Sequence, residues 1–436
     1  DTIVAGIGIT NNDVISKLRG DRGTKVRVKI YRRGVSDLID YTIVRDKIPI
    51  YSVDASYMLK DDIGYIKVNR FSQTTMEEFY EALDELEPLG MKNLVLDLRG
   101  NSGGYLNTAI ELSDEFLADK SLIVYTEGVS NPKRDNFATS RGRFEKGKLV
   151  VLIDEGSASA SEIVSGAVQD HDRGLIIGRR SFGKGLVQRP FKLRDGSTLK
   201  LTTARYYTPA GRCIQRPYEE GNDEYRKESQ RRRDNGELFS MDSIHVDDHE
   251  EYFTDNKRKV YGGGGILPDL FIPLDTSENS DFLRDLLSNG LFYQFVNEYV
   301  DANRDELTSK YPDFETFDSN FDVDGKFVEE FFAFAEKEMK PQDKKADSIT
   351  EVDDEFVESP VKKSGNEEEK DFATRKEEGM QASGKIIRTR LKALLARTLW
   401  QTEAFYRVFN AEDDAVVKAI ESIEDKTFRK LKLSYN

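Results

Sequence analysis

The sequence contains one cysteine and three histidines among its 436 residues, and this scarcity narrows what the chain can do. Cys213 has no second cysteine to pair with, so an intrachain disulfide is excluded. That fits a reducing compartment, or an exported protein that folds without bridges. Cys213 stands between Arg212 and Ile214 with no histidine close in sequence, and we interpret it as an incidental thiol rather than a nucleophile.

Long apolar runs and a basic surface are missing as well. No run approaches the roughly 20 apolar residues that are needed to cross a bilayer, so the sequence predicts no membrane-spanning helix. The formal net charge of -15 argues against nucleic-acid binding, which requires a clustered basic face. The basic run at 231–233 lies among acidic and amide side chains, and we interpret it as part of a solvated loop.

The sequence starts at Asp1 rather than at a methionine, inside a stretch that already reads as structure. We therefore expect a signal segment, an anchor or part of a domain ahead of it. A chain of 436 residues is too long for one compact core, which predicts two or three domains.

The first region, residues 1–45, contains a short amphipathic helix at 12–19 and two alternating strands at 25–32 and 38–44. A helix and a hairpin are too little for an independent fold. We interpret the region as the back half of a small β-rich module.

The second region, residues 46–275, alternates between short strands and helices, which predicts an α/β core with crossover connections. Thr75 and Glu78 have the spacing of a capping box at the start of a helix. Asp195 and Gly196 suit a tight turn between the strands of a long hairpin. The predicted strands are 63–71, 93–98, 122–125, 149–153, 175–177, 186–193 and 198–207, and the predicted helices are 75–86, 106–117 and 159–169.

Two further segments differ from this alternation. Residues 217–260 are polar, and we interpret them as an irregular surface insertion within the core. The third region, residues 276–436, is helical. It contains predicted helices at 281–299, 327–339 and 384–409, with a charged stretch at 340–378 that predicts a mobile linker.

Ser159 has the sequence context of a serine at the start of a helix, because apolar residues recur at helical spacing after it. With Glu162 three residues later it fits an N-cap with a capping box, which is a structural role. The same position suits a nucleophile, since free backbone N–H groups and the helix dipole stabilise a developing oxyanion. Ser157 and Ser161 are competitors that helix position alone does not exclude.

Lys184 lies between Gly183 and Gly185 among apolar neighbours, where burial would favour the neutral form of its amine. A serine hydroxyl needs a base, and a neutral lysine can supply one. On an extended strand Lys184 and Gln188 would share a face, which places the amide within reach of the amine. A surface lysine beside a polar neighbour is the structural alternative.

The stretch 97–104, Asp-Leu-Arg-Gly-Asn-Ser-Gly-Gly, follows a predicted strand and precedes a helix. It lacks the Walker lysine pattern and a spaced Gly-x-Gly-x-x-Gly, so nucleotide binding is disfavoured. The backbone N–H groups of a turn at Gly103 and Gly104 would instead suit an oxyanion hole.

The histidines add little to this site. His171 lies at the far end of the helix that Ser159 begins, about 18 Å away at the rise of an α-helix, whereas proton transfer needs roughly 3 Å. The same distance predicts a structural role for Asp170. His245 and His249 stand amid acidic residues, where a polar loop of mixed charge explains them better than a metal site does.

The stretches 97–104, 156–163, 181–188 and 207–212 resemble, in order and spacing, the C-terminal (tail-specific) processing peptidases. The resemblance covers about 63–215 and extends weakly to 265–269. It implies that Ser159 is the nucleophile, that Lys184 is the base and that Gln188 orients the lysine. It also implies an oxyanion hole made by the backbone N–H groups of Ala160 and of Gly103 or Gly104.

The resemblance further implies a crotonase-like or ClpP-like protease core, preceded by the latter part of a PDZ domain at 1–45 whose helix at 11–19 flanks a peptide groove. The expected activity is that of a serine endopeptidase acting through an acyl-enzyme, without a metal or organic cofactor. The expected substrates are proteins that are unfolded or have exposed C-terminal tails. The expected location is a bacterial periplasm or cell envelope, nucleic acid is not an expected partner, and a homo-oligomer remains open.

Two alternatives stand beside this interpretation. A catalytically silent peptide-binding scaffold would have the same fold. An acyl-transfer protein acting on thioesters would share the glycine-turn chemistry, but the sequence shows no basic pocket for a coenzyme phosphate.

Overall fold

The computed structural model describes residues 9–31, 35–48, 50–218, 221–244, 251–339 and 371–435. The chain divides into two compact units, one made of residues 1–50 and 339–356 and the other of residues 51–338 and 357–436. Within the described ranges, no helix is both long enough and apolar enough to cross a membrane.

The first unit contains a helix and a two-stranded antiparallel ribbon, α1 (Asn11–Leu18), β1 (Lys25–Ile30) and β2 (Ile39–Val44). Thr10 caps the start of the helix through its side chain. The guanidinium of Arg45 donates to the carbonyl of Leu18 at 2.7 Å and to Thr24 Oγ1 at 3.0 Å, which ties the end of α1 to the ribbon. The predicted helix and hairpin are therefore present.

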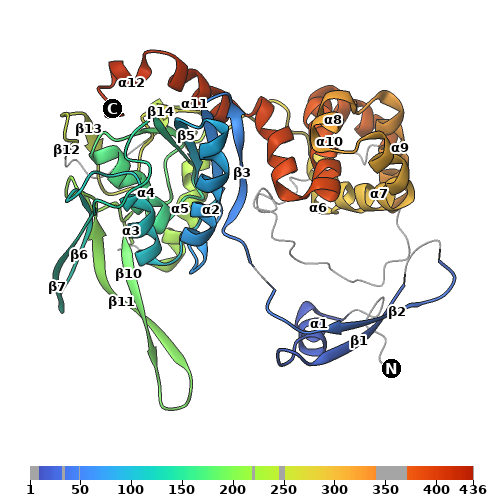
Figure 1. The fold of residues 1–436 in the computed structure, drawn as a ribbon, viewed down its shortest axis with the longest axis horizontal. Coiled ribbons are helices and arrows are strands. Elements are labelled where there is room, and N and C mark those ends of the chain that lie inside the picture. The colour runs from blue at the N-terminus through green and yellow to red at the C-terminus, as the bar shows by residue number, and fades with distance from the viewer. Residues whose placement is uncertain are drawn as a thin grey trace. The chain divides into compact units, whose positions relative to one another are not determined.

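The second unit is built on a six-stranded sheet in the order β14-β9-β8-β5-β4-β3 (Figure 1). All neighbouring pairs are parallel except β3 with β4, which are antiparallel at one edge. The strands are β3 (Val53–Lys60), β4 (Ile63–Val68), β5 (Asn93–Asp97), β8 (Leu149–Ile153), β9 (Leu175–Gly178) and β14 (Leu270–Phe271). A mixed α/β core is thereby confirmed, and β3 and β14 were not predicted.

Three crossover helices cover one face of this sheet, α2 (Thr75–Leu86), α3 (Leu106–Asp114) and α4 (Ala160–Asp170). The capping box predicted at Thr75 and Glu78 is wrong. Thr74 is the N-cap and makes no side-chain cap bond, while Glu78 accepts the backbone N–H groups of Ser52 at 2.6 Å and Val53 at 2.8 Å. The Glu78 carboxylate therefore stabilises the start of β3 rather than the start of α2.

The opposite face of the sheet is covered by the last helices, α11 (Asp414–Glu424) and α12 (Thr427–Lys430) (Figure 1). Their apolar side chains pack on residues from β4, β5, β8 and β9, because successive residues of a strand point to opposite faces. The contributing residues of this C-terminal layer are Ala415, Val416, Ala419, Ile423, Phe428 and Leu433. The core of the α/β region is therefore completed by the end of the chain.

A second, four-stranded antiparallel sheet has the order β10-β11-β6-β7. Its strands are β6 (Leu122–Gly128), β7 (Asn131–Phe137), β10 (Leu186–Lys192) and β11 (Thr198–Tyr207). Strands β10 and β11 form the predicted hairpin, which turns at Asp195 and Gly196. The insertion is not irregular as predicted, because it contains α5 (Asn222–Asp234), β12 (Glu251–Phe253) and β13 (Lys259–Tyr261).

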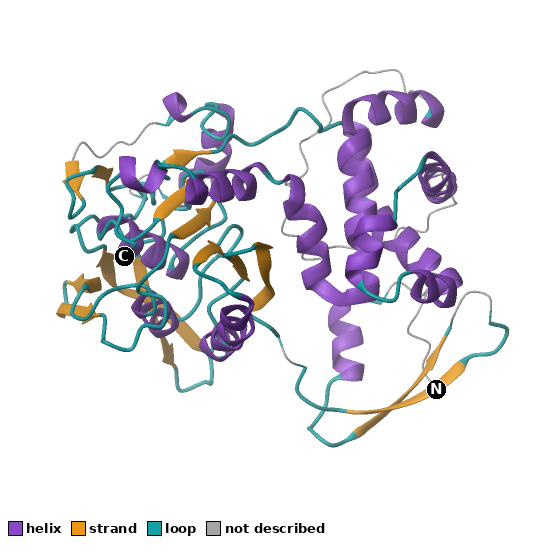
Figure 2. Ribbon diagram, turned by 45° about the horizontal axis from the view of Figure 1, so that its top comes forward, coloured by secondary structure: helices purple, strands orange, loops and turns teal. Residues whose placement is uncertain are grey.

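The helical region comprises α6 (Asp281–Ser288), α7 (Leu291–Lys310), α8 (Phe314–Asn320), α9 (Gly325–Met339) and α10 (Phe372–Phe409) (Figure 2). Two predictions need correction. The single helix at 281–299 is broken at Gly290, which has a φ of 65°. Residues 372–378, placed in the linker, already belong to α10, which bends where Trp400 and Gln401 leave helical geometry. The predicted linker residues 340–370 lie outside the described residues.

Candidate active site

The loops that follow three neighbouring parallel strands meet at the carboxyl edge of the large sheet. They are 98–104 after β5, 154–159 after β8 and 179–185 after β9. Backbone hydrogen bonds join them, from Ala158 N to Asn101 O at 2.9 Å and from Phe182 N to Ser157 O at 2.9 Å. The sequence motifs singled out in these loops therefore form one site, at the edge where open α/β sheets bind their ligands.

Ser159 presents its hydroxyl at a strained turn into α4. Its φ of 54° and ψ of -105° are unusual for a residue with a side chain, and such strain is typical of a nucleophile held at a strand-to-helix turn. Ser157 and Ser161 are both fully buried and donate to the carbonyls of Leu98 and Asn101 at 2.8 Å. Of the three serines in this run, Ser159 is thus the one with an accessible hydroxyl.

The turn at Gly103 and Gly104 packs directly against the serine. Both glycines have positive φ, 102° and 154°. The Gly103 N–H donates to Asn101 Oδ1 at 2.9 Å, so it is already engaged. Among the hydrogen bonds of the described residues, the N–H groups of Gly104 and Ala160 serve as donors to none. The Gly104 and Ala160 N–H groups therefore have no acceptor among the described residues, whereas the Gly103 N–H has one.

Gly103→Ala should displace the serine and lower turnover by roughly 100-fold. A Cβ at this position would lie 2.8 Å from both Ala158 O and Ser159 Cβ, on a backbone whose φ is 102°. The control is Gly196→Ala at the hairpin tip, where φ is 87° and nothing lies within 4 Å of the added Cβ. Peptide turnover and thermal melting of both variants would check this. Equal losses of activity would show that backbone strain alone accounts for the effect.

Glu162 connects Ser159 with the loop 179–185, which contains Lys184 and is called the lysine loop below. Its carboxylate is fully buried and accepts Ser159 N at 2.7 Å, Ser181 Oγ at 2.6 Å, Gly183 N at 2.6 Å and Lys184 N at 2.9 Å. Burial raises the pKa of Glu162, while the four donated hydrogen bonds act in the opposite direction. The capping-box spacing predicted only the bond to Ser159. The three bonds to the lysine loop come from residues distant in sequence and had no local signal.

Lys184 is half-buried and precedes β10 rather than lying on it. The hydroxyl of Tyr206 donates to the carbonyl oxygens of both Ser159 and Lys184, so the two backbones are clamped from this side as well. The side chains are not joined, because no hydrogen bond between described atoms links Ser159 Oγ with Lys184 Nζ. The structure therefore brings the two loops together without a hydrogen bond between these two side chains.

Gln188 is exposed on β10. Lys184 precedes β10, so the strand alternation used to place Gln188 on the face of the lysine does not extend to Lys184; the register shift between Val187 and Gln188 puts the extra residue, Thr203, on β11. The predicted contact between this amide and the lysine is absent from the hydrogen bonds of the described residues.

Asp97 and Arg99, at the start of the stretch that leads to the glycine turn, belong to a buried group of ion pairs. Asp97 accepts the Tyr65 hydroxyl at 2.7 Å and forms an ion pair with Arg99 at 2.6 Å. Arg99 also binds Asp413, the N-cap residue of α11, with both carboxylate oxygens at 2.8 and 3.0 Å. Burial alone would raise the pKa of Asp97, but Arg99 and Lys67 together hold it well below its usual value. The turn is thereby tied to the C-terminal layer.

Asp97→Asn should lower the free energy of unfolding at pH 7 by roughly 3 kcal/mol, because it leaves buried cations without their partner. A depressed pKa stabilises the fold above the unfolded-state value of about 4 and loses that contribution as the pH falls below it. The difference between wild type and variant should therefore shrink between pH 6 and pH 3. Urea unfolding at several pH values measures it, with the exposed Asp61→Asn as control. A difference that does not change with pH would contradict the assignment.

The residues at the far end of α4 are structural, as expected. His171 follows α4, with Nδ1 2.8 Å from Asp255 Oδ2 and Nε2 2.7 Å from Leu122 O. Asp170 accepts the Ala210 N–H at 2.9 Å and pairs with Arg212 at 2.5 Å, which fastens the end of the hairpin to the helix. His245 and His249 lie outside the described residues.

The mixed sheet with helices on both faces defines the class, an α/β protein, with a serine at a strained helix start on the carboxyl edge of the sheet. Residues 62–220 match, more narrowly, the model of Peptidase family S41. The expected resemblance is confirmed for this stretch. Residues 282–401, in the helical region, match a family of unknown function, DUF8443.

Two curated relatives carry related names. The chain is 42% identical over 213 residues to the carboxy-terminal-processing protease of Bartonella bacilliformis, covering 48% of each chain. It is 39% identical over 207 residues to the carboxy-terminal processing protease CtpA of Bacillus subtilis, covering 48% of this chain and 44% of that protein. The chain thus spans about half the length of the curated relatives it matches.

Among solved structures, the photosystem II D1 C-terminal processing protease is 27% identical, with 59% of this chain and 58% of that chain covered. Its TM-score is 0.37.

Proposed function

We propose that this protein is a serine endopeptidase that cleaves protein substrates near their C-termini. The observation that carries the proposal is the position of Ser159, an accessible hydroxyl on a strained turn beside the N–H groups of Ala160 and Gly104. The match of residues 62–220 to Peptidase family S41 and the names of the relatives support it.

In the proposed mechanism, neutral Lys184 takes the proton of Ser159 Oγ as the oxygen attacks the peptide carbonyl. The N–H groups of Ala160 and Gly104 hold the oxyanion, an acyl-enzyme forms, and water then releases it. Gln188 would orient the lysine amine. Because the side chains of Ser159, Lys184 and Gln188 are not hydrogen-bonded to one another, we propose that the described arrangement is a resting form.

The proposed substrates are unfolded proteins or proteins with exposed C-terminal tails. Residues 1–45 would be the latter part of a PDZ domain that presents such tails. We propose a location in the bacterial periplasm or cell envelope, because the relatives are bacterial proteins. The mechanism needs no metal or organic cofactor.

Serine labelling tests the proposal against its main rival. A catalytically silent peptide-binding scaffold would give neither cleavage of an unfolded protein nor a fluorophosphonate adduct on Ser159. A peptidase should give both, with the adduct located by mass spectrometry. Failure of both with folded protein and a range of unfolded substrates would overturn the proposal.

A further inference from the structure

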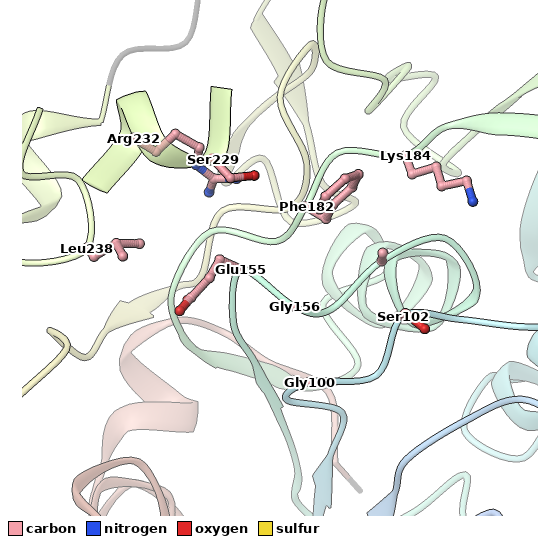
Figure 3. Close-up of a pocket in the computed structure, with 10 residues that line it drawn as sticks. Gly100, Ser102, Glu155, Gly156, Phe182, Lys184, Ser229, Arg232 and Leu238 are labelled. Atoms are coloured by element: carbon pink, nitrogen blue, oxygen red, sulfur yellow. The ribbon is translucent and has the colours of Figure 1, made fainter. Parts of the chain in front are cut away.

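A cavity of about 490 Å³ opens where the insertion meets the three loops of the candidate active site (Figure 3). Across it, Ser229 and Arg232 of α5 face Glu155, Gly156 and Gly100. The full lining is Gly100, Ser102, Glu155, Gly156, Ala158, Phe182, Lys184, Ser229, Arg232 and Leu238. The cavity therefore borders the loop 98–104 at Gly100 and Ser102, the loop 154–159 that ends at Ser159, and the proposed base, and the insertion supplies its outer side.

The lining is suited to an uncharged side chain. Small residues and the apolar Phe182 and Leu238 make up much of it. The charge of Arg232 is already satisfied, because its guanidinium donates to Glu237 Oε1 at 2.7 Å and to the carbonyls of Ser181 at 3.0 Å and Arg180 at 2.9 Å. Glu155 is likewise paired, with Arg179 at 2.7 Å. An apolar group can enter without leaving the charge of Arg232 or of Glu155 unpaired, and the third ionisable residue of the lining, the half-buried Lys184, is the proposed base.

The outer wall of the cavity, formed by Ser229, Arg232 and Leu238, is held against the lysine loop by side-chain contacts. The guanidinium of Arg216 lies 3.9 Å from the centre of the Phe182 ring and 4.0 Å from that of Tyr225 on α5. Arg216 also pairs with Glu228 on α5, and Arg180 pairs with Glu237 at 2.6 Å beyond the helix. These contacts hold α5 in place relative to Phe182 and Lys184, so the cavity is formed before a substrate arrives.

We propose that this cavity is a substrate subsite that takes one apolar side chain of the peptide, and that α5 and Leu238 set the size it accepts. The inference rests on the proposed function: the cavity is lined by the three loops that carry Gly104, Ser159 and Lys184, so a peptide bound at Ser159 would place a neighbouring side chain in it. The insertion lies largely beyond residues 62–220, so the subsite wall is an addition to the part of the chain that matches Peptidase family S41.

Ser229→Trp tests the proposal, because an indole on α5 would occupy part of the cavity. Ser229 is exposed at the cavity mouth, so folding should be preserved. We expect the wild-type protein, on a mixed-peptide library read by mass spectrometry, to favour an apolar residue at one position. In the variant, cleavage of peptides with a large apolar residue at that position should fall by roughly tenfold or more relative to cleavage of peptides with a small one. Gln230→Trp, next along the helix and outside the lining, should keep the wild-type profile.

A second variant widens the cavity. Leu238→Ala removes buried apolar volume from the wall and should shift the preference toward larger side chains at the same position. Cleavage by all variants with unchanged profiles, or a wild-type preference for basic or acidic residues at that position, would overturn the subsite. Absence of cleavage by the wild type would instead count against the proposed function, so the two failures are distinguishable.

Discussion

Ser159→Ala should reduce cleavage of an unfolded protein by roughly four orders of magnitude or more, and Lys184→Ala should do the same. The two residues act as one unit in the proposed mechanism, so either loss removes covalent catalysis and leaves only binding and the oxyanion hole. The double variant should cleave the substrate no more slowly than either single variant. Initial rates on a fluorescent unfolded substrate, together with circular dichroism to confirm folding, would measure this.

Two control variants distinguish a loss of catalysis from a loss of core packing. Ser161→Ala removes a buried hydroxyl that donates to Asn101 O, and it should lower stability while retaining a labelled Ser159. Lys192→Ala, on the exposed part of β10, should leave turnover unchanged. Near-wild-type turnover in Ser159→Ala or Lys184→Ala would show that the proposed dyad is wrong.

Glu162→Gln should lower both turnover and stability. The carboxylate accepts four hydrogen bonds, and an amide would present an NH₂ group to some of those donors and leave them unsatisfied. Unsatisfied buried groups cost about 1–3 kcal/mol each, so we expect a loss of roughly 3 kcal/mol in the free energy of unfolding. Because Ser159 and the lysine loop would shift together, kcat should fall by roughly 100-fold.

Glu78→Gln is the matched control for this variant. Glu78 also accepts two backbone N–H groups, from Ser52 and Val53, but at the entry of β3. It should lower the melting temperature and leave kcat unchanged at a temperature where both proteins are folded. If Glu162→Gln lowered stability alone, Glu162 would be a packing residue rather than one that positions the serine and the lysine.

Local patterns in the sequence predicted most of the elements that build the site. The strand at 149–153 and the helix at 75–86 coincide with β8 and α2, because their apolar periodicity reflects direct burial. Ser159 was expected at a helix start, and α4 begins at the next residue. The meeting of the three loops follows from the parallel sheet, whose carboxyl ends share one edge.

The remaining features depend on contacts between residues far apart in sequence. Helix α5 was missed because it has no apolar stripe: Arg232 is buried and bonded to Glu237 and to a backbone carbonyl, while Arg231 is exposed. The run 231–233 therefore lies on a helix with one buried arginine, and the predicted solvated loop is wrong. The bonds of Glu162 to the lysine loop and of Tyr206 to both backbones likewise have no periodic signal. The alternation assumed for Lys184 and Gln188 fails because β10 begins only at Leu186, after the lysine.

The C-terminal layer has a consequence for the order of events during synthesis. The sheet strands from β4 to β9 are translated long before α11 and α12, yet one face of that sheet stays uncovered until residues 414–433 leave the ribosome. Asp413, which holds Arg99 beneath the glycine turn, arrives at the same late moment. A nascent chain therefore exposes one apolar face of the sheet until the whole helical region has been synthesised, and the proposed hydrolytic centre gains the support of Asp413 only after that. Such late closure would keep the proposed centre incomplete while the rest of the core is still being assembled.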